Sequence, residues 1–85
     1  MYEREIKITS KYGLHARPAA SFVERAGKYD SEIEIVHDGE PANGKSIISL
    51  LALAAGKGDR IIIRAEGKDE TDAVNDLVDF LKEAE

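Results

Sequence analysis

The hydrophobic pattern of this 85-residue chain changes repeatedly between a period of two residues and a period of about 3.6 residues. Alternation of apolar and polar residues predicts half-buried strands at residues 2–9, 32–36 and 59–66, and the hairpin signal Asp38-Gly39 predicts a further short strand at residues 40–43. Because each strand alternates, one face of the sheet should be in water and helices should cover the other. The chain is therefore restricted to a single small α+β domain, residues 1–85, with a layer of helices against a sheet.

Three segments between or after these strands are predicted to be helices, the first and third from the helical spacing of their apolar residues and the second from its high Leu and Ala content. The first runs from Ala16 to about Gly27, and the second covers residues 47–55. The third begins after Asp69, which we expect to cap it. Its apolar stripe consists of Ala73, Val74, Leu77, Val78, Leu81 and Ala84. The predicted element order is thus β-α-β-β-α-β-α.

Charge and cysteine content narrow the classes of function. The chain has 17 acidic and 12 basic side chains, a formal net charge of −5 and no cysteine. Phosphate backbones repel this charge, which argues against nucleic acid as a partner and suits docking to a protein with a basic patch. The absence of cysteine excludes disulfides, thiol nucleophiles and thiolate metal sites. Since the sequence has no long apolar run and no charged-then-apolar leader, we expect a cytoplasmic chain without membrane insertion.

The segment GLHARPA, residues 13–19, places His15 where a loop enters the first helix. The N–H groups of Ala16 and Arg17 have no acceptor within a helix that starts there, and with the helix dipole they form an anion site. Pro18 loses no useful donor at such a position. A phosphoryl group on the His15 ring would rest against this helix end, with the guanidinium of Arg17 beside it. Judged by residue types alone, a helix-capping histidine beside an ordinary surface arginine stays open as the alternative.

The string KYGLHARPAA at positions 11–20 resembles the HPr family, the small histidine phosphocarriers of the bacterial phosphoenolpyruvate-dependent sugar phosphotransferase system. A second string, NGKSI at positions 43–47, is similar to the family's second functional segment. The resemblance implies an open-faced β-sandwich, a four-stranded antiparallel sheet with three helices on one face. It also implies a monomeric stoichiometric carrier rather than an enzyme, without cofactor or metal. His15 would accept a phosphoryl group from phospho-enzyme I and pass it to IIA domains of sugar permeases or, alternatively, serve a nitrogen-related regulatory branch.

The resemblance assigns roles to further residues. Ser46 reads as a plain N-cap of the second helix, and in the family the serine at this place is a target of HPr kinase/phosphorylase. The commonest regulatory pattern has Met-Gly after Ser-Ile, whereas this chain has Ile48-Ser49. The residues expected to contact partner proteins around His15 are Leu14, Ala20, Ile47, Ile48 and Leu51.

Two other interpretations come from different classes of protein. Residues 39–46 match the P-loop pattern G-x-x-x-x-G-K-S, but Pro41 removes a loop N–H, and Asp38-Gly39 is better explained as a hairpin turn. A regulatory adaptor that transfers nothing would have no need of His15 beside an arginine. We interpret the second histidine, His37, as a solvated residue at a strand end, and we expect no metal site.

Overall fold

The computed structural model describes residues 1–83. Ala84, expected at the end of the last apolar stripe, and residue 85 of the predicted domain lie outside the described residues. The elements are β1 (Tyr2–Lys7), α1 (Ala16–Ala26), β2 (Glu32–His37), β3 (Glu40–Asn43), α2 (Ile47–Ala52), β4 (Arg60–Glu66) and α3 (Glu70–Glu83). Their order confirms the predicted sequence of strands and helices.

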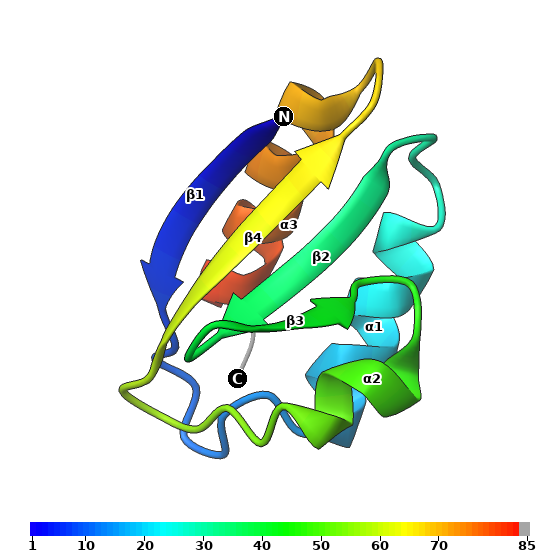
Figure 1. The fold of residues 1–85 in the computed structure, drawn as a ribbon. Helices are drawn as coiled ribbons and strands as arrows, with labels where there is room; N and C mark the ends of the chain where they lie inside the picture. The colour runs from blue at the N-terminus through cyan, green and yellow to red at the C-terminus, as the bar shows by residue number, and fades with distance from the viewer. Residues whose placement is uncertain (84–85) are drawn as a thin grey trace.

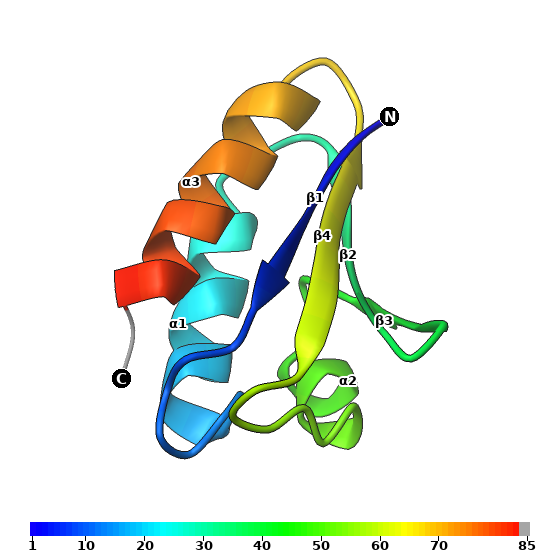
Figure 2. The ribbon, with the colours of Figure 1, turned by 90° about the vertical axis from the view of Figure 1, so that its left-hand side faces the viewer.

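The four strands form one antiparallel sheet in the order β1-β4-β2-β3 (Figure 1). Seen from the edge, α1 and α3 lie side by side on one face of the sheet, and α2 lies near the β3 end of the layer (Figure 2). The opposite face of the sheet carries no helix within residues 1–83. This is the open-faced β-sandwich expected from the sequence.

The alternation in each strand explains why the helices cover only one face. In β2 and β4 every second side chain from Ile33 to Ile35 and from Ile61 to Ala65 is buried against the helix layer, whereas in β1 only Ile6 is buried. The buried side chains that join sheet and helices include Ile6, Ile33, Ile35, Ile61, Ile63, Phe22, Val74 and Leu77. Burial of apolar surface of this kind is the dominant stabilising contribution to a domain of this size.

Two elements end earlier in the structure than the sequence predicted. The second helix was expected to reach residue 55, but it ends at Ala52, because Leu53 closes the helix and Ala54 has a positive φ of 52°. Ala55 stays buried in the following loop, so its apolar character lengthened the predicted helix. The first strand ends at Lys7, although Ile8 still exchanges backbone hydrogen bonds with the loop before β4.

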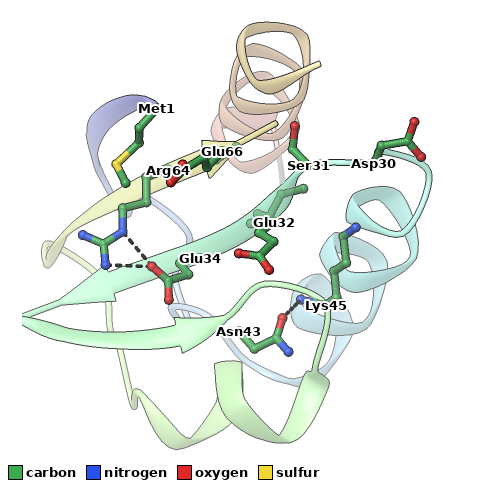
Figure 3. Close-up of a pocket in the computed structure, with 11 residues that line it drawn as sticks. Met1, Asp30, Ser31, Glu32, Glu34, Asn43, Lys45, Arg64 and Glu66 are labelled. Atoms are coloured by element: carbon green, nitrogen blue, oxygen red, sulfur yellow. Dashed lines mark hydrogen bonds and ion pairs between the residues drawn. The ribbon is translucent and has the colours of Figure 1, made fainter. Parts of the chain in front are cut away.

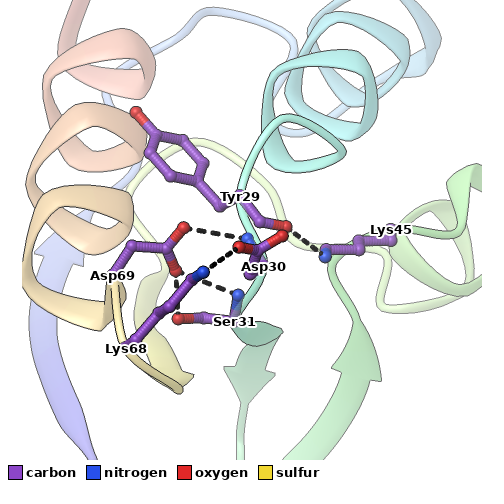
Figure 4. Close-up of polar contacts among 6 residues, drawn as sticks. All are labelled: Tyr29, Asp30, Ser31, Lys45, Lys68 and Asp69. Atoms are coloured by element: carbon purple, nitrogen blue, oxygen red, sulfur yellow. Dashed lines mark hydrogen bonds and ion pairs between the residues drawn. The ribbon is translucent and has the colours of Figure 1, made fainter.

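Asp69 directly precedes α3 as expected, and its carbonyl accepts the Ala73 N–H at 2.9 Å, while its carboxylate bonds the loop before β2 (Figure 4). It accepts hydrogen bonds from the Asp30 N–H at 2.8 Å, from the Ser31 N–H at 3.0 Å, and from the Ser31 hydroxyl. The Ser31 hydroxyl, followed by these backbone donors, lowers the pKa of the Asp69 carboxyl. The side chain therefore ties the start of α3 to the loop between α1 and β2.

The P-loop interpretation is wrong, because residues 38–43 form a hairpin turn and a paired strand. Asp38 and Gly39 have φ values of 52° and 80°, and they join β2 to β3 as a hairpin. Pro41 lies in β3, an edge strand, where a missing N–H is tolerated. Residues 40–43 are thus used in strand pairing rather than in a phosphate-binding loop.

His37 corrects another expectation, since its side chain is not solvated. The side chain is only 14% exposed, and its Nε2 lies 3.2 Å from Asp59 Oδ2. Its Nδ1 lies 3.1 Å from the carbonyl oxygen of Leu53. The histidine therefore links the β2–β3 hairpin to the loop that follows α2.

Candidate functional site

The loop before α1 is held in place by the segment that follows α2. The N–H of Leu14 donates to the Ala55 carbonyl at 2.9 Å, and the N–H of Gly13 donates to the Ser10 carbonyl at 3.1 Å. Gly13 has a φ of 69°, and a Cβ built there would lie 2.5 Å from the Ala55 carbonyl oxygen. Only glycine fits this turn without displacement of the backbone. The segment that leads into His15 is therefore well anchored.

His15 occupies the N-cap position of α1. Its backbone is extended, with φ −92° and ψ −175°, and its carbonyl accepts from the Ala19 N–H at 3.0 Å. The side chain makes no capping hydrogen bond and is partly exposed. The interpretation of His15 as a helix-capping side chain therefore has no support in the geometry.

The N-terminus of α1 is electrostatically suited to an anion. The 11-residue helix has no acidic side chain in its first turn. Its opening N–H groups, at Ala16 and Arg17, precede the first intrahelical donor and point out of the helix end. The side chain of Arg17 is exposed, whereas Pro18 is buried. The helix end thus combines peptide donors with a guanidinium two residues after His15.

Tyr12 was not among the sequence-predicted site residues, yet its ring contacts that of His15. The ring centroids are 5.8 Å apart and the ring planes meet at 86°. Tyr12 belongs to the string at positions 11–20 that carries the family resemblance, but no role of its own was predicted for it. A signal was available in the composition, since an aromatic residue in a polar turn three positions before a histidine has no role in the core.

The expected docking residues divide into exposed and buried ones. Ile48 is 78% exposed, Ile47 and Leu51 are also exposed, and Ala20 lies on the exposed side of α1. We call these four residues the apolar surface. Leu14, in contrast, is only 6% exposed and belongs to the core, because its backbone is drawn toward Ala55. Its side chain is not placed to meet a partner.

Ser46 is the N-cap residue of α2, as the sequence predicted. Its Oγ accepts a hydrogen bond from the Ser49 N–H at 3.3 Å. The preceding Lys45 reaches away from the helix, and its Nζ donates to the Tyr29 carbonyl at 2.7 Å (Figure 4). Ser46 is partly exposed and directly precedes Ile47 of the apolar surface.

A hollow of about 450 Å³ lies on the open side of the sheet, apart from His15 (Figure 3). Its charged side chains include Glu32, Glu34, Glu66 and Arg64, and Arg64 pairs with Glu34 at 2.7 Å. None of the sequence-predicted site residues lines it. The described residues also contain no group of three acidic, histidine or cysteine side chains arranged to hold a metal ion. No helix within residues 1–83 is long and apolar enough to span a bilayer.

Comparisons with known proteins agree on one family. Residues 2–83 match the family model described as the PTS HPr component phosphorylation site. The chain is 48% identical to the phosphocarrier protein HPr of Buchnera aphidicola subsp. Baizongia pistaciae, over 95% of each protein. It is 44% identical to the HPr-like protein Crh of Halalkalibacterium halodurans, over 96% of this chain and 98% of that one.

Two solved structures extend the comparison to the fold. The crystal structure of HPr-C-His from Thermoanaerobacter tengcongensis superposes with a TM-score of 0.92 at 43% identity, covering 96% of this chain and 92% of that one. Crh of Bacillus subtilis, described as a swapped, intertwined dimer, superposes with a TM-score of 0.79 at 36% identity, covering 98% and 95%.

Proposed function

Because this chain belongs to the HPr family of the phosphotransferase system, we propose that His15 accepts a phosphoryl group from phospho-enzyme I and passes it to IIA domains of sugar permeases. The observation that carries this proposal is a partly exposed imidazole at the N-cap position of an 11-residue helix that has no acidic side chain in its first turn. The chain acts as a stoichiometric carrier rather than as an enzyme. It works in the cytoplasm, where both partners would present their phosphorylated or acceptor groups.

The transfer step needs few parts. A ring nitrogen of His15 donates its lone pair to phosphorus, and the bond between phosphorus and enzyme I breaks with its electron pair returning to enzyme I. The phosphoryl oxygens then face the N–H groups of Ala16 and Arg17 and the Arg17 guanidinium, which stabilise their negative charge. Donors that are already oriented stabilise the transition state without reorganisation. Transfer to a IIA domain reverses these bond changes.

Exposure of the site supports a carrier that serves two partners. His15 lies at the end of a helix rather than in a closed cavity, so two different protein surfaces can reach the same atom. The apolar surface, Ala20, Ile47, Ile48 and Leu51, supplies exposed hydrophobic area of the kind that forms the centre of protein interfaces. We therefore assign it to docking with enzyme I and IIA domains.

Ser46 is proposed as a regulatory phosphorylation site for HPr kinase/phosphorylase. A phosphate at the N-cap of α2 would be tolerated by the helix, since negative charge is favoured there. The same charge would stand beside Ile47 of the apolar surface and oppose docking to an acidic partner surface. The departure from the commonest regulatory pattern, Ile48-Ser49, bears on recognition by the kinase and not on this electrostatic effect.

We propose a monomer as the working state. Its support is that β1 pairs with β4 of the same chain and that one core joins all the helices and the sheet. Crh of Bacillus subtilis is described as a swapped dimer, so sedimentation velocity across a range of concentrations is the appropriate test. A single species with the mass of one chain is expected, and a concentration-dependent dimer would contradict the proposal.

The function is tested by a relay experiment with labelled phosphoenolpyruvate, enzyme I and a sugar-specific IIA domain. Label should appear on the chain as one acid-labile, base-stable group and then move to the IIA domain. His15→Ala should block both steps, whereas His37→Gln should retain them, because His37 lies in the hairpin contact with Asp59. Label that enters the chain but reaches only a nitrogen-branch IIA protein would assign the carrier to that branch.

A further inference from the structure

We infer that Tyr12 is a positioning residue for phosphoryl transfer, which holds the His15 imidazole in place at the N-terminus of α1. This inference rests on the proposed carrier function of His15. Its first support is the ring contact, with centroids 5.8 Å apart and planes at 86°. Edge-to-face contact is a preferred arrangement of aromatic rings, because the positive edge of one ring meets the negative face of the other. Tyr12 acts through His15 and is assigned no contact with the phosphoryl group.

The backbone supplies the second support, since Tyr12 and His15 flank an anchored segment. Gly13 is held in a left-handed conformation against Ala55 and Gly56, and Leu14 is buried. A shift of Leu14 would break its hydrogen bond to the Ala55 carbonyl. A shift of Gly13 would press its backbone against that of Ala55 and Gly56. The two rings therefore project from fixed points, so their contact restrains side-chain torsions and not the whole loop.

A third support is the environment of the Tyr12 ring itself. The Lys11 ammonium lies 5.4 Å from the ring centroid, within the range of a cation–π interaction. Together, Lys11, Tyr12 and His15 form a contiguous series of contacts at the entrance to α1. The lysine restrains the tyrosine, and the tyrosine in turn restrains the histidine.

Exposure distinguishes this contact from ordinary core packing. Tyr12 is 69% exposed, whereas the chain's four other aromatic side chains, all within the described residues, are buried or partly buried. A tyrosine left in water adds little to the free energy of folding through burial. Its contact with the proposed phosphoryl-accepting ring gives this exposed side chain a role that burial does not.

The expected consequence is a change in rate without a change in affinity. A histidine side chain has several staggered χ1 positions, and only some present a ring nitrogen at the helix end. Loss of an aromatic contact should lower kcat for phosphorylation by enzyme I about threefold to tenfold in Tyr12→Ala, with KM unchanged. Tyr12→Phe keeps the ring and should stay within about twofold of the parent.

The test combines nuclear magnetic resonance of the histidine rings with initial rates of phosphorylation. Without any partner protein, Tyr12→Ala should shift the His15 ring-proton signals, and Tyr12→Phe should nearly preserve them. The His37 signals serve as the internal control, because this ring contacts Leu53 and Asp59 instead. The kcat values for enzyme I should follow the same order.

Three outcomes would overturn the assignment of Tyr12. His15 signals and kcat that remain at parent values in Tyr12→Ala would show that the contact has no effect. A change confined to KM would make Tyr12 a docking residue, and a Tyr12→Phe variant as slow as Tyr12→Ala would implicate the hydroxyl group. A parent chain that takes no phosphoryl group from enzyme I would instead overturn the carrier function, and with it the transfer role of Tyr12.

Discussion

Replacement of Gly13 by alanine tests whether the loop before His15 is anchored as the structure indicates. Gly13 has a φ of 69°, and an added Cβ would lie 2.5 Å from the Ala55 carbonyl oxygen and 2.6 Å from Gly56 Cα. Both obstacles are backbone atoms, which cannot rotate away as the end of a side chain can. The substitution should therefore move the loop or the segment after α2.

A matched control separates two contributions to the expected loss of folding free energy, the left-handed backbone strain and the clash with packed backbone. Gly39 also has a positive φ, 80°, but a Cβ there would meet nothing within 4 Å. Gly39→Ala should thus show only the left-handed strain of about 1–2 kcal/mol, partly offset by reduced entropy of the unfolded chain. Gly13→Ala adds the displacement of packed backbone, comparable to overpacking at about 1–3 kcal/mol. We expect a total loss of about 2–4 kcal/mol for Gly13→Ala.

Urea unfolding of the two variants and the parent at one temperature measures the loss of unfolding free energy in each variant. In a domain of this size each kcal/mol corresponds to about 4–8 °C in Tm, so Gly13→Ala should melt about 8–32 °C below the parent. Phosphorylation of the folded fraction should also slow, because His15 is carried on the displaced loop. A Gly13→Ala variant no less stable than Gly39→Ala would refute the proposed anchoring of this loop.

Three further predictions concern single side chains. Arg17→Ala should slow phosphorylation by enzyme I at least about tenfold and hardly change Tm, because an exposed arginine contributes little to folding; a sharp fall in Tm with normal transfer would make it structural. Ser46→Asp should leave Tm within about 3 °C, since aspartate also caps helices, while transfer slows about tenfold; transfer at the parent rate would reduce Ser46 to a helix cap. The pKa of the Asp69 carboxyl is lowered in the folded state, so its stabilisation is present above its ordinary pKa of about 4 and is lost as pH falls through the lowered value. Asp69→Asn should therefore be less stable at pH 7, and urea titrations at several pH values should show this gap narrowing below about pH 5; a constant gap would contradict the assignment.

The element order could be predicted because three strands and the first and last helices show the expected periodicity. The Asp38-Gly39 turn indicated β3, and the Leu and Ala content of residues 47–55 indicated α2, in which only Leu50 is buried. Errors arose where a residue's role depends on distant contacts. Asp69 precedes α3 as predicted, but the hydrogen bonds of its carboxylate to Ser31, 38 positions earlier, could not be predicted from local sequence. Ala55 continues the apolar run of the second helix in sequence, yet in the structure it lies in a loop, where it is buried and its carbonyl accepts the Leu14 N–H.

In the candidate site, too, features set by local sequence could be predicted, and those set by distant contacts could not. The resemblance of residues 11–20 pointed to His15 and Arg17, whose place at the start of α1 follows from local sequence. The burial of Leu14 depends on its hydrogen bond to Ala55, which no local pattern reveals. The sequence shows an aromatic residue in a polar turn at position 12, but its contact with His15 depends on the left-handed turn at Gly13.

The central claim, that His15 carries the phosphoryl group, is tested most directly by locating phosphorus on the two histidine rings. The ¹⁵N-labelled chain is phosphorylated by enzyme I and phosphoenolpyruvate, and its ring nitrogens are examined for coupling to phosphorus. We predict coupling at one ring nitrogen of His15 and unchanged signals from His37. Coupling at His37, or a stable phosphate ester at Ser46 with both rings unmodified, would contradict the account.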